Sequence, residues 1–189
     1  VSGVINDIKI TAVSSDFDFL GASMAAAEGE AFLYGIQHAI ENKTAFLCVS
    51  AGGGMRMMES LISLSQMTRT TLAINELKNN NLPYIVCITD PTAGGITASY
   101  AMLGDIHIAE PGALIAFAGA RVIQGTVKEE LPEGFQKSEY VEKTGFIDLI
   151  VERKDLAEKI GTLLSILLKK NSVISTEQDE TTENTQSLS

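Results

Sequence analysis

Two pairs of adjacent glycines are the residues best suited to chemistry in this sequence. Gly53-Gly54 and Gly94-Gly95 each follow a short apolar run and precede a stretch of helical composition. Glycine lets the backbone come close to a ligand, and the first N–H groups of a helix have no partner within it. Such a turn favours negative charge, whether a phosphate, a carboxylate or the oxyanion of an enolised thioester. A tight turn without a ligand is the alternative for either pair alone.

Side chains that could act as a nucleophile, a base or a metal ligand are scarce. The two histidines, His38 and His107, fall within an expected helix and an expected strand, where structural or exposed positions are more typical. Ser50 and Ser99 have no identifiable catalytic partner. No group of His, Cys, Asp and Glu has metal-ligand spacing, so no metal is expected. We therefore expect backbone donors, rather than reactive side chains, to do the chemistry.

Two arginines and two cysteines leave alternatives open. Arg56, one turn inside the expected helix, could pair with a substrate phosphate or anchor the loop to an acidic residue such as Glu59. Arg121 could clamp a ligand or form a surface ion pair. Cys48 and Cys87 lie in separate apolar runs, which is typical of buried, reduced thiols.

The elements that must position these residues alternate along the chain. Apolar runs and helical composition predict strands at 9–19, 45–49, 84–89, 106–109 and 114–117, and helices at 23–40, 55–80, 96–103, 139–144 and 154–169. The helix at 55–80 is expected to bury Leu61, Ile62, Met67, Leu72 and Leu77. This alternation predicts a layered α/β fold, since a strand that is apolar throughout needs cover on both faces. Neither a Gly-x-Gly-x-x-Gly fingerprint nor a phosphate loop is present.

Composition limits the classes of protein. The 189 residues are 45% hydrophobic, enough for one domain at 1–170, and the polar composition of 171–189 predicts a disordered tail. The net charge of −10, from 24 acidic and 14 basic residues, argues against a free-standing nucleic-acid binder. No apolar stretch is long enough to cross a bilayer and no signal peptide is visible, so a cytoplasmic location is expected. The start at Val1 suggests a fragment whose natural beginning lies upstream.

Four segments together resemble a known family, the carboxyltransferase beta subunits of bacterial acetyl-CoA carboxylase. The segment 50–59, Ser-Ala-Gly-Gly-Gly-Met-Arg-Met-Met-Glu, is similar to that family's first signature, and the segments 82–105, 108–123 and 131–139 match the later ones in order. The likeness runs over roughly residues 10 to 168. The family's four zinc-binding cysteines, normally in an N-terminal ribbon, are absent, and Met55 and Ala120 stand where alanine and proline are usual.

The resemblance implies a crotonase-like fold of repeated strand-strand-helix turns wound into a superhelix. It also implies that carboxybiotin, on a biotin carboxyl carrier protein, gives its carboxyl group to acetyl-CoA to form malonyl-CoA in fatty-acid synthesis. An alpha subunit would supply the biotin site, biotin carboxylase would complete the complex, and this chain would bind no cofactor covalently. By the same resemblance Gly94 and Gly95 hold the thioester oxygen. Substrate-binding roles are expected for Gly53, Gly54, Arg56 and Arg121.

Two other functions remain open at this point. One is a crotonase-like acyl-CoA enzyme that acts alone, such as a hydratase or a decarboxylase, which would need its own acid or base. The other is a noncatalytic assembly module in which the glycines only make turns.

Overall fold

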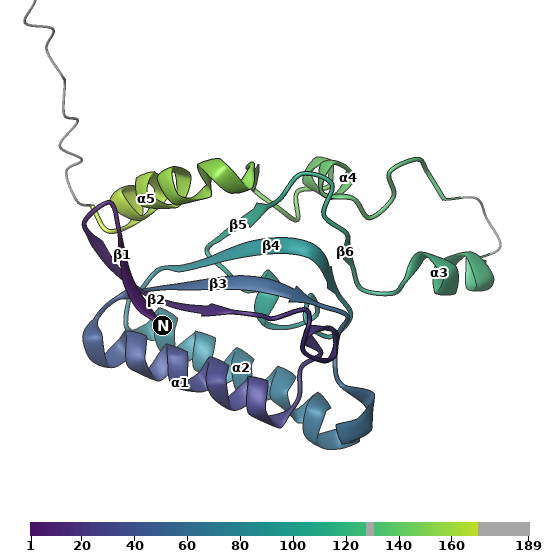
Figure 1. The fold of residues 1–189 in the computed structure, drawn as a ribbon, viewed down its shortest axis with the longest axis horizontal. Coiled ribbons are helices and arrows are strands. Elements are labelled where there is room, and N and C mark those ends of the chain that lie inside the picture. The colour runs from purple at the N-terminus through teal and green to yellow at the C-terminus, as the bar shows by residue number, and fades with distance from the viewer. Residues whose placement is uncertain (128–130, 170–189) are drawn as a thin grey trace, which may run out of the picture.

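A seven-stranded sheet lies between helices in the computed structural model, which describes residues 1–127 and 131–169 (Figure 1). The strand order is β1-β2-β3-β4-β5-β7, and β6 pairs with β4. All pairings are parallel except that of β1 with β2. The strands are β1 (Ser2–Ile5), β2 (Ile8–Ser14), β3 (Ala45–Gly52), β4 (Tyr84–Ala93), β5 (Ile106–Ala109), β6 (Ile115–Ala116) and β7 (Leu149–Ile150).

Helices cover both faces of this sheet. They are α1 (Ala26–Asn42), α2 (Ser60–Asn79), α3 (Ala120–Val127), α4 (Ser138–Lys143) and α5 (Leu156–Leu167), with short 3-10 turns η1 (Leu20–Ala22), η2 (Met57–Glu59), η3 (Tyr100–Met102) and η4 (Arg153–Asp155). Helices α1 and α2 lie on one face and α5 on the other (Figure 1). Alternate residues of β3 face opposite sides of the sheet, since Phe46 packs toward α1 while Leu47 packs with α5. The predicted α/β fold is confirmed.

The central strands β3 and β4 bring the two glycine pairs together. Both are buried along most of their length, as expected for parallel strands covered on both faces. Their register pairs Ser50 with Ile88 and then, after an irregularity, Gly52 with Thr92. The strands therefore end side by side, and the glycine turns that follow them leave the sheet at the same edge.

Helix α2 differs from the prediction in its start and in its buried face. It begins at Ser60, after η2, and the predicted core positions Leu61, Ile62 and Leu72 are exposed, so that part of the prediction is wrong. The residues that α2 does bury are Ser63, Gln66, Thr70, Ile74 and Leu77. The reason is a close approach of α1, where a Cβ on Gly29 would collide with the Gln66 side chain.

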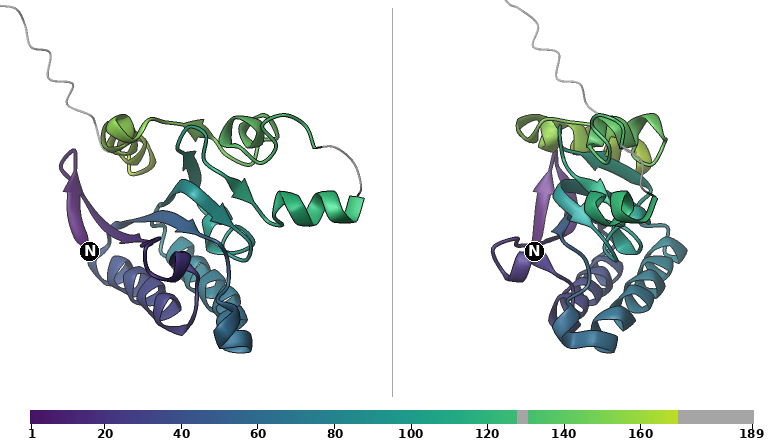
Figure 2. Two further views of the ribbon diagram at one scale, coloured as in Figure 1. Left: turned by 45° about the vertical axis from the view of Figure 1, so that its right-hand side comes forward. Right: turned by 90° about the vertical axis from the view of Figure 1, so that its right-hand side faces the viewer.

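The segment 96–103 is also not the helix that was predicted. It forms turns followed by η3, because Ser99, in the middle of the segment, has non-helical backbone angles, φ −136° and ψ −117°. Strands β1 and β7 and helix α3 were not predicted. Helix α3 stands apart from the sheet in the left view of Figure 2. The tail expected at 171–189 lies outside the described residues, and no helix within the described part is long and apolar enough to span a membrane.

Candidate active site: two apposed glycine turns

The turns at 53–54 and 94–95 lie in direct contact. A Cβ added at Gly54 would sit 3.4 Å from both Gly94 Cα and Gly95 N, and a Cβ at Gly94 would sit 3.1 Å from Gly53 O and Gly54 Cα. Gly54 and Gly94 also have φ values of +121° and +63°, which favour glycine. Both backbone conformation and lack of space therefore call for glycine where the two turns meet.

In each glycine pair the first N–H group is hydrogen-bonded within the chain, and the second has no partner among the described residues. The Gly53 N–H donates to Gly21 O at 3.2 Å, and the Gly94 N–H donates to Ala116 O at 3.0 Å. Within residues 1–127 and 131–169, neither the Gly54 N–H nor the Gly95 N–H has an acceptor within hydrogen-bonding range. Two unpartnered backbone donors thus lie in adjacent turns.

This hydrogen-bonding pattern leaves fewer free amides than we expected from the sequence. Both amides of the 94–95 pair were expected to face a ligand, whereas the Gly94 N–H holds β6 in place and only the Gly95 N–H is unpartnered. No α-helix begins directly at either turn, so the geometry of the turns, rather than a helix dipole, orients the donors.

Side-chain hydroxyls hold the carbonyl groups of the second turn. Thr97 Oγ1 lies 2.8 Å from Gly94 O and 2.7 Å from Ala116 O, and the Ser99 hydroxyl donates to Gly95 O at 2.6 Å. Behind the turn, a Cβ at Gly95 would sit 2.6 Å from Met55 Cγ. The carbonyl groups and one face of the 94–95 turn are therefore fixed from within the chain.

Arg56 contacts protein groups instead of open solvent. Its side chain is only 7% exposed and donates to Ser23 O at 2.7 Å, to Glu59 at 3.0 Å and to Glu28. A hydrogen bond from the Ala26 N–H lowers the pKa of the Glu59 carboxyl group, and the hydrogen bond from Arg56 lowers it further. Of the two roles considered for Arg56, the contacts correspond to the loop anchor. The Arg121 side chain lies outside the described part of the chain.

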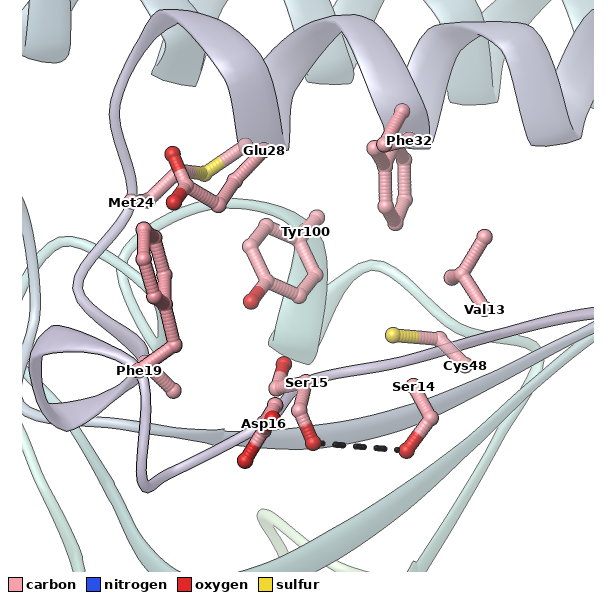
Figure 3. A pocket seen from close by; sticks show the side chains of 12 residues that line it. Val13, Ser14, Ser15, Asp16, Phe19, Met24, Glu28, Phe32, Cys48 and Tyr100 are labelled. Carbon is pink, nitrogen blue, oxygen red and sulfur yellow. Dashed lines mark hydrogen bonds between the residues drawn. The ribbon is translucent and has the colours of Figure 1, made fainter.

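A cavity of about 360 Å³ lies beside the loop that contacts the first glycine turn (Figure 3). Tyr100, Phe32, Cys48 and Ser15 point into it from four different segments. Burial raises the pKa of Cys48 to about 12 and also raises that of Tyr100 well above its ordinary value, so both stay protonated at neutral pH. The cavity was not foreseen, because its walls come from segments far apart in the sequence.

A second cavity, of about 440 Å³, lies beside the 97–102 segment. Thr97 and Ala98 form one wall, and the rest is largely aromatic and aliphatic, including Phe117 and Phe146. The Oε1 atom of Gln136, another wall residue, is buried and has no hydrogen-bond partner within the described residues.

The histidines have structural contacts, as expected. His107 Nε2 accepts the Gly104 N–H at 3.1 Å, and burial lowers its pKa, while His38 Nδ1 lies 3.2 Å from the Thr11 hydroxyl. Neither residue lines the two cavities. In the ranges 1–127 and 131–169 no cluster of three or more His, Cys, Asp or Glu side chains could hold a metal ion.

Known proteins share both the sequence and the fold of this chain. A family model described as carboxyl transferase domain matches residues 1–187. The acetyl-coenzyme A carboxylase carboxyl transferase subunit beta of Pelagibacter ubique (strain HTCC1062) is 79% identical over 184 residues, covering 97% of this chain and 60% of that protein. The same subunit of Hirschia baltica is 52% identical over 166 residues, covering 88% of this chain and 48% of the relative. The chain thus spans about half to three-fifths of these relatives.

Solved structures share the fold of this chain. A transcarboxylase 12S structure with bound methylmalonyl-coenzyme A matches with a TM-score of 0.78 and 28% identity, over 87% of this chain and 32% of that one. A Pseudomonas malonate decarboxylase hetero-dimer matches with a TM-score of 0.77 and 18% identity, over 87% and 75% of the two chains, which shows the fold alone. The crotonase-like fold implied by the sequence resemblance is confirmed. The chain belongs to the carboxyl transferase domain family.

Proposed function

We propose that this chain is the core of an acetyl-CoA carboxyltransferase and that the N–H groups of Gly54 and Gly95 bind the thioester oxygen. The observation behind the proposal is the pair of unpartnered amides in two turns that touch each other. The family membership and the 79% identical relative support the type of reaction.

Carboxylation of a thioester requires stabilisation of negative charge on the thioester oxygen, which these two amides could provide. Loss of a proton from the methyl carbon places negative charge on the thioester oxygen, and donors aimed at that oxygen stabilise the enolate more than the ground state. One such donor contributes on the order of 3 kcal/mol to catalysis. The new bond would join the methyl carbon to the carboxyl group as the N–C bond of carboxybiotin breaks, and the family resemblance implies that the ureido group of biotin freed by this step takes the methyl proton. This chain then needs to supply only orientation and oxyanion stabilisation.

The proposal extends to the partners. Carboxybiotin on a carrier protein would be the carboxyl donor, and an alpha subunit would complete the site, with biotin carboxylase in the full cytoplasmic complex. The names of the relatives, which call them subunits, support an assembly of this kind.

The test is an assay of malonyl-CoA formation by the complete protein, alone and co-purified with an alpha subunit, with carboxybiotin and acetyl-CoA supplied. We expect activity only with the alpha subunit, and we expect Gly95→Val to abolish it, because the branched side chain would crowd Met55 and Met67 behind the turn and so displace the Gly95 donor. Unchanged turnover in Gly95→Val would overturn the proposal. Turnover by the isolated chain would favour an enzyme that acts alone, and failure to bind acetyl-CoA with or without the alpha subunit would favour an assembly module.

A further inference from the structure

We infer that Arg56 is a positioning residue that sets the relative placement of the Gly54 and Gly95 amides. The inference rests on the proposed function and adds a residue that acts on catalysis without touching the substrate. It also explains why a buried arginine lies two residues after a glycine turn.

The guanidinium group of Arg56 joins three segments of the chain. It donates to both the carbonyl and the hydroxyl of Ser23, in the loop that precedes α1, through distances of 2.7 and 3.1 Å. It also pairs with Glu28 in the first turn of α1 and with Glu59 in η2, at the start of α2. The two carboxylates bind backbone amides as well, Glu28 that of Ala25 and Glu59 that of Ala26. The beginnings of α1 and α2 are therefore held by one cation.

From Ser23 the contacts continue directly to the first glycine turn. The neighbouring residue Met24 donates its N–H to Gly54 O at 2.9 Å and accepts the Arg56 N–H at 2.8 Å. Earlier in the same loop, Gly21 O accepts the Gly53 N–H. The loop held by Arg56 is thus hydrogen-bonded to the residues on both sides of the free Gly54 amide, so a shift of the loop moves that amide.

A second path leads from Arg56 to the other free amide. Met55 lies between Gly54 and Arg56 in the chain, and its side chain packs behind Gly95, where a Cβ would sit 2.6 Å from Met55 Cγ and 3.3 Å from Met67 Sδ. The position of the Met55 backbone, bracketed by Gly54 and Arg56, therefore determines the support beneath Gly95. Both donors depend on the same short segment.

The geometry of these contacts is specific to arginine. Four hydrogen bonds leave three different nitrogen atoms of a planar fork in fixed directions, whereas a lysine ammonium is a single point on a flexible stem. Arg56→Lys keeps the positive charge and loses this geometry. Arg56→Met removes both.

A matched control is present on the same two helices. Arg69 of α2 pairs with Glu30 of α1 at 2.7 Å, but this pair is partly exposed and makes no contact with the glycine turns among the interactions of the described residues. It therefore joins α1 to α2 without holding the loop. Arg69→Met should affect the helix contact alone.

The experiment compares Arg56→Lys, Arg56→Met and Arg69→Met in the complete protein with its alpha subunit, measuring kcat, the KM for acetyl-CoA and the melting temperature. We expect kcat to fall at least tenfold in Arg56→Lys and about a hundredfold in Arg56→Met, since displacement of about 1 Å has effects of that size. KM should stay within about twofold, and Arg69→Met should keep the kcat and KM of the wild type.

Three results would overturn the inference. The first is an unchanged kcat in folded Arg56→Lys. The second is a raised KM with unchanged kcat, which would indicate phosphate binding. The third is a lowered melting temperature with full activity below it, which would indicate a purely structural role. If Arg56→Met fails to fold, Glu59→Gln, which keeps the side-chain shape, should still lower kcat, and an unchanged kcat there would count against the inference. An inactive wild type would instead contradict the proposed function.

Discussion

Replacing Gly54 by alanine should remove most of the catalytic activity while leaving a folded protein. The added methyl carbon would lie 3.4 Å from Gly95 N and 3.4 Å from Gly94 Cα. An oxyanion bound to the Gly95 amide must approach to about 2.7–3.1 Å, so the methyl group competes for the space beside that donor.

Two separate costs follow from this substitution. Loss of one oxyanion donor lowers kcat by about 100- to 1,000-fold, equivalent to about 2.7–4 kcal/mol. The φ of +121° at this position is unfavourable for alanine, and strain of this kind costs on the order of 1–3 kcal/mol of stability. The first cost appears in turnover and the second in the urea midpoint, so the two measurements separate them.

Gly145→Ala is the control for strain alone. Gly145 also has a positive φ, +81°, and a Cβ there would meet nothing within 4 Å. We expect it to lose stability and keep wild-type kcat in the malonyl-CoA assay. A folded Gly54→Ala protein with kcat within about twofold of the wild type would refute the assignment of the Gly95 amide as a donor.

Two further predictions concern groups away from the turns. Burial raises the pKa of both Cys48 and Cys87 to about 12, so a thiol reagent at pH 8 should label neither in the native protein and both after unfolding, and rapid native labelling would contradict the buried placement. The Ala26 N–H and Arg56 lower the pKa of Glu59, so its ionised form stabilises the fold above the unfolded value of about 4.3 and this contribution is lost as the pH falls. Glu59→Gln should therefore weaken the loss of urea stability between about pH 5 and pH 3, and an unchanged pH profile would argue against the ion pair.

Part of the fold could be predicted because local pattern and final environment agree. Strands β3 and β4 contain the apolar runs at 45–49 and 84–89 and start where the sequence places them, although β3 continues to Gly52 and β4 continues to Ala93. The turn in the β1–β2 hairpin also has a local signal, because Asn6 and Asp7 are residue types that tolerate the positive φ values which a two-residue hairpin turn requires and which both adopt here. Its strand β1 is mostly exposed and so lacks an apolar pattern.

Other features depend on contacts between distant segments. The buried face of α2 carries Ser63, Gln66 and Thr70 because α1 approaches closely at Gly29, which no periodicity of α2 itself can reveal. The candidate site also depends on contacts between distant segments that the sequence does not reveal. The glycine pairs are visible in the sequence, but which amide of each pair is free depends on Gly21 O and Ala116 O, more than twenty residues away along the chain.

A crystal structure of the complete protein with its alpha subunit and bound acetyl-CoA would test the central claim most directly. We predict that the thioester oxygen lies about 2.7–3.1 Å from both the Gly54 and the Gly95 nitrogen atoms. A thioester oxygen bound elsewhere, with both amides facing solvent or closed off by the chain, would contradict it.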